Sequence, residues 1–487
     1  MTTVASSEVK TPAPSAADTG TALRFITCGS VDDGKSTLIG RLLVDSRAVL
    51  ADQLAGVQRN GETDLALLTD GLSAEREQGI TIDVAYRYFS TPARKFIIGD
   101  APGHEQYTRN MVTAASSADA AVVLVDATKL PWAAEVSDGE VVARTLLPQT
   151  RRHLLLAHLL RVPSLVVAIN KLDAIDEAAL AFERIGGALR DFAEAAGIAL
   201  KAVVPVSALK GWNVTTRHPN GPGQASGWAG YDGPALLELL EQLPVTPADT
   251  QQPFAFPVQW VEKPSAPTLA ASRAALPPEG APAALGSGPA PRPISGSADT
   301  SQGRRIFWGR VASGRIEPGQ RIAILPSNQH ATVARVLTHT RAEAAVPAGH
   351  SAGIVLDREV DVSRGDWLLE PEAFEPQREI HATVAWLDDE PLVAGRVYWA
   401  LHGHRWVKAK VARIAHRLNI HTLEAEEAQQ LEANTIGEVV LALQQPLAVR
   451  PFAEARALGS LVLVDTASHK TAAAALVRAA PARSANT

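Results

Sequence analysis

The chain has 487 residues, which at roughly 150 residues per domain predicts about three domains rather than one core. Charged residues make up 20% of it, the net charge is −6 and no apolar run reaches the roughly 18 residues of a membrane span, so the composition favours neither a nucleic-acid binder nor a membrane protein. The single cysteine, Cys28, cannot form an internal disulfide, and a cytoplasmic location is the simplest interpretation.

The first 22 residues are mostly Thr, Ser, Ala and Pro, without the apolar segment of a secretory signal, so we expect a disordered lead-in over residues 1–22. From there to residue 245, helical patterns alternate with short apolar runs at Phe25–Cys28, Phe96–Ile98, Ala121–Val125, Leu165–Ile169 and Val203–Val206. Continuous apolar runs are typical of strands buried on both faces of a parallel sheet. Residues 23–245 are therefore predicted to form an α/β domain with a doubly wound, mostly parallel sheet.

The alternation of apolar runs and helical patterns ends at about residue 253. Short alternating segments punctuated by Gly and Pro predict antiparallel strands, which we expect to form two β-barrels over residues 253–373 and 374–470, followed by a tail over 471–487. Residues 263–303 hold eight prolines and many Ala, Ser and Gly. Because such a composition buries little apolar surface, we expect a disordered insertion in the first barrel.

The string Gly29–Ser36 matches the phosphate-loop pattern G-x-x-x-x-G-K-[ST], between a predicted strand and a predicted helix. Its glycines let backbone N–H groups point at phosphates, and the helix N-terminus adds a favourable dipole. Lys35 would reach the β- and γ-phosphates, and the Ser36 hydroxyl would bind Mg²⁺. The alternative is a glycine-rich turn followed by an N-capping serine.

Asp100–His104 follows the second apolar run. Asp100 could hold Mg²⁺ through water, and Gly103 could offer its N–H to a γ-phosphate, although the string is also a plain Pro-Gly turn. Thr81 could supply a second hydroxyl to Mg²⁺ from a mobile loop, or could simply begin a strand rich in β-branched residues.

Asn170–Asp173 follows the fourth run, and Ser207–Leu209 follows the fifth. Asp173 could accept hydrogen bonds from both N1–H and N2–H₂ of guanine, a donor pair that adenine lacks. A backbone N–H in Ser207–Leu209 could donate to guanine O6. Since open α/β sheets bind ligands at the carboxyl ends of their strands, we expect these strings to converge there.

The predicted site is therefore a nucleotide site with a metal ion. Its metal ligands would be Ser36, Thr81 and Asp100, and its nucleotide-contacting residues would be Gly29, Ser30, Val31, Asp32, Asp33, Gly34, Lys35, Ser36, Thr37, Asp100, Ala101, Pro102, Gly103, His104, Asn170, Lys171, Leu172, Asp173, Ser207, Ala208 and Leu209.

Several other conspicuous residues are given structural roles. Cys28 is expected to be a small core residue. His402 and His404 have no partner ligands at a convincing metal-binding spacing. The residues 151–153 are expected to be a solvated face at a helix start unless a partner docks there, and three tryptophans are expected in a barrel core or rim, namely Trp386, Trp399 and Trp406.

Together these residues resemble the translational-type GTPases, the elongation factor Tu superfamily, and within it the large subunits of bacterial heterodimeric ATP sulfurylase, or sulfate adenylyltransferase. The resemblance extends from about residue 24 to 466. The strings that carry it are residues 28–43, 70–89, 149–153, 256–259 and 311–316.

The resemblance implies a GTPase domain, two β-barrels, GTP and Mg²⁺ as cofactors, and a heterodimer with a small catalytic subunit that binds ATP and sulfate. The small subunit would make adenosine 5′-phosphosulfate and pyrophosphate, driven by GTP hydrolysis. The resemblance also implies that His104 positions or polarises the attacking water, with Val31 and Ile80 as a hydrophobic gate. The alternative is a translation factor that delivers aminoacyl-tRNA, which would need a basic surface that the net charge of −6 does not support.

Overall fold

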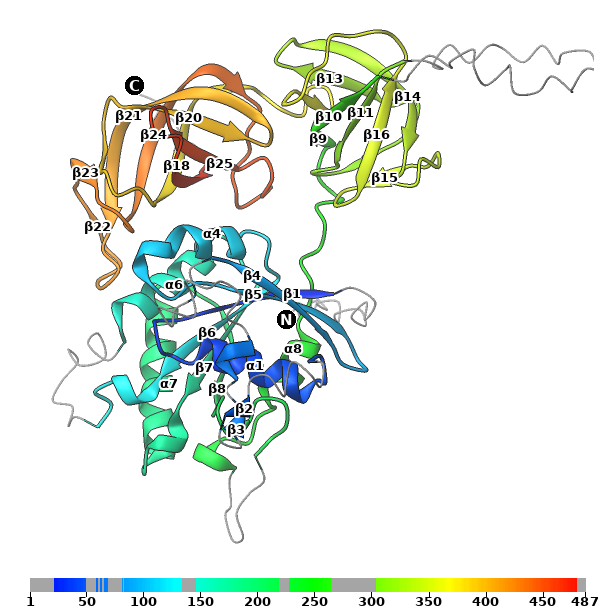
Figure 1. Ribbon diagram of the computed structural model, residues 1–487. Coiled ribbons are helices and arrows are strands. Elements are labelled where there is room, and N and C mark those ends of the chain that lie inside the picture. The colour runs from blue at the N-terminus through cyan, green and yellow to red at the C-terminus, as the bar shows by residue number, and fades with distance from the viewer. Residues whose placement is uncertain are drawn as a thin grey trace, which may run out of the picture. The chain divides into compact units, whose positions relative to one another are not determined.

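The computed structural model describes residues 22–49, 58–59, 62–63, 65–68, 81, 83–133, 146–218, 227–263 and 304–479 (Figure 1). The chain divides into an N-terminal unit, Met1–Thr246 with Leu418–Glu426, and a C-terminal unit, Pro247–Arg417 with Glu427–Thr487. The expected lead-in and insertion lie outside the described residues, except for Ala22 and Lys263. Among the described residues, no helix combines the length and the apolar character needed to cross a bilayer.

The N-terminal unit is built on a six-stranded sheet in the order β4-β5-β1-β6-β7-β8. Its strands are β1 (Leu23–Cys28), β4 (Ala85–Ser90), β5 (Lys95–Asp100), β6 (Ala120–Asp126), β7 (Ser164–Asn170) and β8 (Leu200–Pro205). All neighbouring pairs are parallel except β4–β5, so the predicted mostly parallel sheet has one antiparallel edge. A separate pair joins β2 (Gln58–Arg59) to β3 (Glu62–Thr63).

Helices cover both faces of this sheet. The α-helices are α1 (Lys35–Asp45), α4 (Thr108–Ala115), α6 (Pro148–Leu159), α7 (Ala178–Ala195) and α8 (Leu236–Gln242). One-turn 3₁₀ helices are η1 (Ala66–Leu68), η2 (Glu105–Tyr107), η3 (Ala127–Lys129), η4 (Leu172–Ala174) and η5 (Trp228–Gly230).

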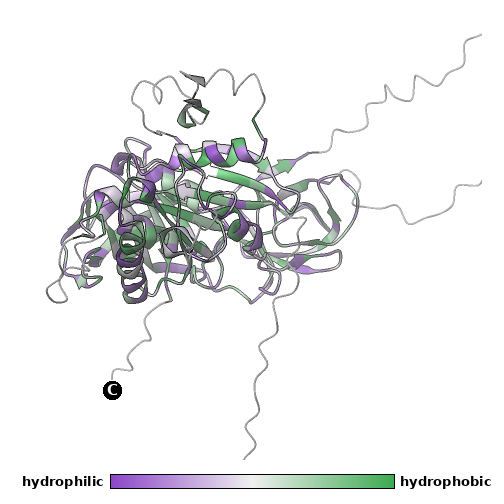
Figure 2. Cartoon of the chain, turned by 90° about the horizontal axis from the view of Figure 1, so that it is seen from below, coloured by the Kyte–Doolittle hydropathy of each residue, from purple (hydrophilic) through white to green (hydrophobic). Residues whose placement is uncertain are grey.

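The central strands are apolar because both of their faces are buried. Every residue of β6 and of β7 is buried, which explains their unbroken apolar runs. Alternate residues of the strands share one core with α1 and α8, as Phe25 and Val122 do with Leu38 and Leu240. Helices α4, α6 and α7 pack against the same strands. Figure 2 shows hydrophobic residues along the interior strands and mixed hydropathy along the surface helices.

The first barrel of the C-terminal unit has seven strands in the order β10-β11-β16-β14-β13-β17-β9. The strands are β9 (Ala255–Pro257), β10 (Trp260–Glu262), β11 (Ile306–Arg310), β13 (Arg321–Leu325), β14 (Gln329–Leu337), β16 (Ser351–Leu356) and β17 (Trp367–Leu369), with β12 (Arg315–Ile316) and β15 (Val346–Pro347) as a separate pair. Because β9 and β10 are consecutive in the chain and lie at the two ends of this order, the sheet curls back on itself.

The second barrel has the order β20-β25-β26-β18-β24-β21 and closes through a further β20–β21 pairing. The strands are β18 (Gln377–Trp386), β20 (Val397–His402), β21 (Arg405–Leu418), β24 (Ile436–Leu447), β25 (Ser460–Asp465) and β26 (Thr471–Val477). The short strands are β19 (Leu392–Val393), β22 (Ala425–Glu426) and β23 (Gln430–Leu431).

Strand β26 corrects the prediction of a tail that begins at residue 471. The segment pairs with both β18 and β25, so it is a central strand of the barrel. Ala472, Ala473 and Ala475 are completely buried. Alanine is small enough to pack at these interior positions, so the alanine-rich segment can form a buried strand.

Candidate functional site

A pocket of about 260 Å³ lies in the N-terminal unit and brings together residues from four predicted strings. It is lined by Val31, Asp32, Gly34, Lys35, Ser36, Thr37, Ala66, Thr81, Gly103, His104 and Lys171. Strands β1, β5 and β7 run in parallel and deliver three of these strings to the same edge of the sheet, while Thr81 precedes the antiparallel strand β4.

The N-terminus of α1 is built to bind an anion. The helix begins at Lys35, and its N-cap Gly34 has left-handed dihedral angles (φ 93°, ψ 26°) with no side-chain cap. The first N–H groups of an uncapped helix are free for a ligand, and the helix dipole favours negative charge there. A Cβ at position 34 would also collide with Asn170 Nδ2, so both conformation and space require glycine.

The Lys35 ammonium is buried against its own loop. Nζ donates to the carbonyl oxygens of Ser30 at 2.7 Å and Gly29 at 3.2 Å. Burial lowers the pKa of Lys35, which the nearby carboxylates of Asp100 and Asp33 oppose. A buried cation that is held mainly by carbonyl groups has a strong electrostatic preference for an anionic ligand, so the site fits a phosphate.

Asp100–Gly103 packs directly on the phosphate loop. The Asp100 side chain is buried at the end of β5, where Thr27 Oγ1 donates to it at 3.4 Å. A Cβ on Gly103 would collide with Lys35 Nζ and would lie 2.7 Å from Gly29 O, so only glycine allows this approach. The structure thus places Gly103 beside the lysine, as the string predicts, while Ala101 is buried and does not line the pocket.

His104 lies in the wall of the pocket as the N-cap of η2. Its ring Nδ1 accepts a hydrogen bond from the Gln106 N–H, with 3.3 Å between the nitrogens. A neutral imidazole with an accepting Nδ1 carries its proton on Nε2. His104 in this tautomer offers a hydrogen-bond donor at Nε2, which suits orienting or polarising a reactant better than removing a proton from it.

Asn170 and Leu172 belong to the segment Asn170–Asp173, which is expected to bind guanine and is called the guanine string below. In the structure both side chains make internal contacts. Asn170 is buried, donates from Nδ2 to Asp33 O at 2.8 Å and accepts from Ala208 N–H at 3.0 Å, so it ties the phosphate loop to the loop after β8. The Leu172 side chain is completely buried and packs in the interior. Both side chains thus have internal roles in the structure, and their contact with a nucleotide stays a prediction.

The other residues expected to contact guanine differ in their exposure. Asp173 forms an ion pair with Lys210 at 3.5 Å and does not line the pocket. Ser207 is buried and its Oγ accepts from Lys210 N–H at 3.1 Å, whereas the Leu209 side chain is 65% exposed. Lys171, with φ 64°, lies in the pocket wall.

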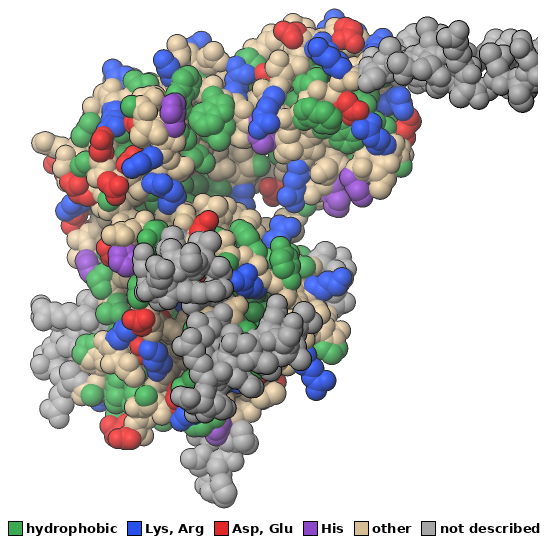
Figure 3. All heavy atoms as spheres, in the orientation of Figure 1, with side chains coloured by type: hydrophobic (Ala, Val, Ile, Leu, Met, Phe, Trp, Pro, Cys, Tyr) green, Lys and Arg blue, Asp and Glu red, His purple; other side chains and the backbone are tan. Residues whose placement is uncertain are grey.

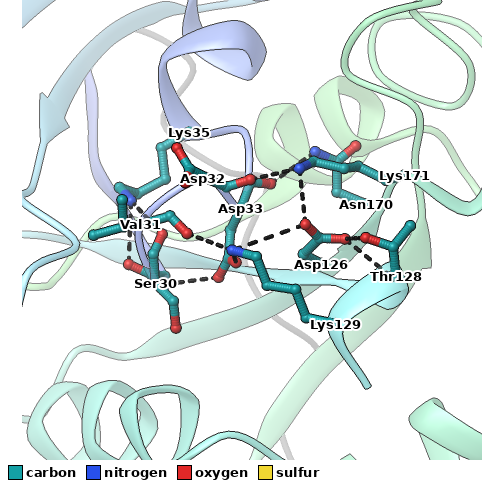
Figure 4. A network of polar contacts seen from close by, with 11 residues as sticks. Ser30, Val31, Asp32, Asp33, Lys35, Asp126, Thr128, Lys129, Asn170 and Lys171 are labelled. Atoms are coloured by element: carbon teal, nitrogen blue, oxygen red, sulfur yellow. Dashed lines mark hydrogen bonds and ion pairs between the residues drawn. The ribbon is translucent and has the colours of Figure 1, made fainter. Parts of the chain in front are cut away.

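The sequence interpretation missed a polar network beside the phosphate loop, shown in Figure 4. Asp126 at the end of β6 accepts from Thr128 and pairs with Lys171 at 2.8 Å, and Lys129 pairs with Asp33 at 3.0 Å. Their position at or just after the end of the buried strand β6 is the sequence feature that could have indicated them, because the predicted site segments also follow buried strands.

The expected solvated face of residues 151–153 is also corrected. Arg151 and His153 are buried in α6, and Gln149 Nε2 donates to Gly103 O at 3.5 Å. Arg152 Nη1 donates to Glu105 Oε1 at 2.7 Å. The start of α6 therefore holds the loop around His104 instead of facing water.

Of the remaining conspicuous residues, Cys28 is buried, and burial raises the pKa of its thiol to about 12. His402 is buried, its Nε2 lies 3.1 Å from Leu458 O, and its ring stacks on Trp367. Trp386 belongs to the core of the second barrel, while Trp406 is 51% exposed. Ile80 lies outside the described residues.

Comparison with known proteins agrees with this geometry. Residues 21–245 match the family described as elongation factor Tu GTP binding domain, and residues 379–478 match the family described as GTP-eEF1A C-terminal domain-like. The chain is 41% identical to sulfate adenylyltransferase subunit 1 of Laribacter hongkongensis over 470 residues, which cover 94% of this chain and 85% of that protein. The chain belongs to the sulfate adenylyltransferase subunit 1 family.

Other members of the family are similarly related. The subunit 1 of Erwinia tasmaniensis is 39% identical, with 94% of this chain and 86% of that protein covered. The bifunctional enzyme CysN/CysC of Xylella fastidiosa is 41% identical over 93% of this chain, and this chain spans 65% of that longer protein. The predicted family and fold class are confirmed, and the N-terminal unit of this sulfate adenylyltransferase subunit 1 relative is a GTP-binding domain.

Proposed function

We propose that this chain is the GTP-hydrolysing regulatory subunit of sulfate adenylyltransferase, a nucleotidyltransferase of sulfate assimilation. It would couple GTP hydrolysis to the formation of adenosine 5′-phosphosulfate and pyrophosphate from ATP and sulfate on a partner subunit. The observation that carries the proposal is the pocket that brings Lys35, Thr81, Gly103 and His104 together in a chain 41% identical to subunit 1 of that enzyme.

In this proposal the phosphates of GTP lie against the phosphate loop and the start of α1. Lys35 would exchange its bonds to the carbonyls of Gly29 and Ser30 for bonds to phosphate oxygens, and Ser30 Oγ, which is buried without a partner among the described residues, would gain one. Ser36 and Thr37 follow within the first turn of α1. The remaining backbone N–H groups of the loop would donate further hydrogen bonds to the phosphates.

The base of GTP would lie against the loops after β7 and β8. Asp173 would accept from N1–H and N2–H₂ of guanine, and a backbone N–H of Ser207–Leu209 would donate to O6. Ala208 N–H already donates to Asn170 Oδ1, so the neighbouring Leu209 N–H is the better candidate of the two. The exposed Leu209 side chain would cover one face of the base.

Mg²⁺ fits the donors at the phosphate end of the pocket. The hydroxyls of Ser36 and Thr81 lie in the wall, and the Asp100 carboxylate lies at the end of β5. Among the described residues there is no group of three or more His, Cys, Asp or Glu side chains that could hold a metal alone. Mg²⁺ suits such a site because it keeps several waters and takes phosphate oxygens, and when bound it would offset phosphate charge.

Hydrolysis would be an in-line attack of water on the γ-phosphorus, with GDP as the leaving group. The Nε2–H of His104 would orient this water or donate to a γ-phosphate oxygen. Gln149 and Arg152 hold the two residues on either side of His104, through Gly103 O and Glu105, and so limit the motion of its backbone. A fixed donor contributes more than a mobile one, since no reorganisation is needed in the transition state.

The partner would be the small, catalytic subunit, with which this chain would form a heterodimer or an assembly of heterodimers. The relatives carry the name subunit 1, which implies at least one further subunit in the complex. A cytoplasmic location stays a prediction. Sulfate activation is uphill, so GTP hydrolysis that is uncoupled from it would dissipate energy, and a dependence of hydrolysis on the partner is expected.

The test is GTP hydrolysis by the purified full-length chain, with the small subunit, ATP and sulfate omitted in turn. We expect slow hydrolysis by the chain alone and acceleration of roughly tenfold or more when all components are present, together with adenylylsulfate synthesis. His104→Ala should reduce hydrolysis about 100-fold or more and leave GTP affinity within about threefold. His339→Ala, which alters an exposed histidine of the first barrel, is the matched control.

The alternative is a translation factor, whose hydrolysis would respond to ribosomes and not to the sulfurylase partner. The face in Figure 3 carries Lys and Arg interspersed with Asp and Glu on both units, without a continuous basic surface. RNA binding depends on clustered positive charge, which this face does not present. Stimulation by ribosomes with no response to the small subunit would contradict the proposed function.

A further inference from the structure

Three consecutive carbonyl groups of the phosphate loop are held by side chains from other parts of the sheet edge (Figure 4). Lys129 Nζ, from η3, donates to Val31 O. Lys171 Nζ donates to Asp32 O at 2.6 Å, and Asn170 Nδ2 donates to Asp33 O at 2.8 Å.

These contacts fix which way the loop's N–H groups point. In a trans peptide, the carbonyl and the N–H of the next residue point in opposite directions. Holding the carbonyls of Val31 to Asp33 therefore fixes the directions of the N–H groups of Asp32 to Gly34, of which the N–H of Asp33 donates to Ser30 O at 3.4 Å. Asp32 and Gly34 line the pocket. Asp32 also has a φ of 62°, an uncommon conformation for a residue with a side chain, which persists only where surrounding contacts impose it.

Buried charge explains why the two lysines stay in place. The side chains of Asp33 and Asp126 are each only 1% exposed. Lys129 Nζ lies 3.0 Å from Asp33 and 3.9 Å from Asp126, and Lys171 Nζ lies 2.8 Å from Asp126. Two buried carboxylates thus need two ammonium groups, and each ammonium also reaches one loop carbonyl.

The pKa shifts agree with this arrangement. Burial raises the pKa of Asp33, and Lys129 opposes the rise. Burial also acts to raise the pKa of Asp126, but hydrogen bonds from Lys171 and Thr128 outweigh it, so that pKa is lowered. Asp126 is thereby kept as an anion that can anchor both lysines.

We propose that Lys129 and Asp126 are positioning residues of the phosphate site, which hold the loop in its anion-binding conformation through Val31 O. Neither residue belongs to the phosphate-loop or the guanine string, and neither lines the pocket. They act through the loop and not by touching the nucleotide. The inference rests on the proposed binding of GTP.

The test uses Lys129→Met in the full-length chain, with affinities for GTP and GDP measured by titration. We expect both affinities to fall by about 10- to 100-fold and their ratio to stay the same, because the loop conformation serves the phosphates that the two nucleotides share. Lys129→Arg, which can keep both the charge and a donor, should recover affinity to within about threefold of the unmodified chain. Lys201→Met changes an exposed lysine of β8 and is the matched control.

A second variant separates positioning from mere charge neutralisation. Asp33→Asn combined with Lys129→Met removes the unpaired buried carboxylate, so the thermal stability lost in Lys129→Met should return. The nucleotide affinity should stay low, because Val31 O still has no donor. Asp126→Asn should weaken both nucleotides as Lys129→Met does, since it loosens the anchor of Lys129 and Lys171.

The outcomes are distinct. If the unmodified chain does not bind GTP, the proposed function fails. If it binds GTP and Lys129→Met leaves both affinities unchanged, the positioning role is overturned. The role is also overturned if Asp33→Asn restores the affinity of Lys129→Met, or if Lys129→Met weakens GTP alone, since the latter would indicate direct contact with the γ-phosphate.

Discussion

At the scale of single residues, Asp173 has a second partner that bears on base recognition. Its Oδ2 lies 3.5 Å from Lys210 Nζ, and the same ammonium lies 4.6 Å from the centre of the Trp212 ring. The Lys210 ammonium thus contacts both the ring and the carboxylate. Lys210 can therefore balance the Asp173 charge while other lone pairs of the carboxylate face the base.

Asp173→Asn is predicted to change the base specificity. The substitution replaces one acceptor oxygen by an NH₂ donor that would face guanine N2–H₂, and GTP affinity should fall by roughly 30- to 1000-fold, or about 2–4 kcal/mol. Xanthine carries a carbonyl at C2, so xanthosine triphosphate should bind the variant better than GTP does. Competitive titration with GTP, xanthosine triphosphate and ATP measures this.

Lys210→Met is the control for this prediction, since it removes the ion pair but leaves both acceptor oxygens of Asp173. It should keep the preference for GTP over xanthosine triphosphate. Equal binding of GTP and ATP by the unmodified chain would show that Asp173 does not select guanine.

Residues that belong to a known sequence motif could be assigned to the site from the sequence. The contacts that support these residues could not be predicted. Lys35 and His104 line one pocket because the parallel strands before them end at a common edge, and Thr81, before the antiparallel strand β4, lines the same pocket. Asp126 and Lys129 follow a strand in the same way but match no string. Lys129 meets Asp33, 96 residues away in sequence, and no local pattern encodes a pairing at that separation.

At the scale of elements, helix α6 shows where the polar character of residues misleads. Residues 151–153 are expected from the sequence to face solvent, yet Arg152 donates to Glu105, and His153 Nε2 lies 2.9 Å from Gln149 Nε2, which reaches Gly103 O. The five apolar runs were all found as strands because burial on both faces leaves an unmistakable pattern. The edge strand β4 was not specified, since it alternates between exposed and less exposed residues and borders the string around Thr81.

His153 predicts how acid affects the N-terminal unit. Burial, with smaller contributions from Lys35 and Arg152, lowers the pKa of His153 to about 3. Since the unfolded chain has the ordinary value of about 6.5, the unfolded state binds a proton first, and stability is lost as pH falls below about 6.5. At pH 5 the expected loss from this residue is about 2 kcal/mol, as an upper estimate.

Urea unfolding of the full chain at pH 7.5 and pH 5.0 measures this effect. In His153→Gln, which is neutral at both pH values, the difference in unfolding free energy between the two conditions should shrink by up to about 2 kcal/mol. The exposed His339 offers the comparison His339→Gln, in which the difference should stay as in the unmodified chain. An unchanged difference in His153→Gln would mean that His153 is protonated in the folded state.

At the scale of the whole molecule, the sequence predicts several domains and a change from an α/β domain to antiparallel β-structure. The exact limits of the domains stay predictions. The two units have separate cores, so a change in one need not reach the other. Residues 263–303 separate strands β10 and β11 in the sequence, but the two strands are paired neighbours in the first barrel. Strands β10 and β11 pair antiparallel on either side of them, with Glu262 opposite Ile306.

Replacing residues 265–301 by a short Gly-Ser turn is therefore predicted to be tolerated. The β10–β11 register, with Trp260 opposite Trp308, holds the two ends of the segment close enough for a short connection. If the segment is as disordered as its composition predicts, shortening it from about 40 residues to about five lowers the closure cost by about 2 kcal/mol at most, so the C-terminal unit should unfold at the same temperature or slightly higher. GTP affinity should stay within about twofold, because the described residues that line the pocket all belong to the N-terminal unit, whereas this segment interrupts the first barrel in sequence.

The control is a chain in which residues 265–301 keep their composition but have a scrambled order. If the segment acts only as a connection, the scrambled and shortened chains should both bind GTP and respond to the small subunit as the unmodified chain does. Because closure cost depends on length and not on order, only the shortened chain should gain stability. Loss of GTP binding in the shortened chain would show that the segment has a structural role. If both altered chains bind GTP but no longer respond to the small subunit, the partner recognises the sequence of the segment itself.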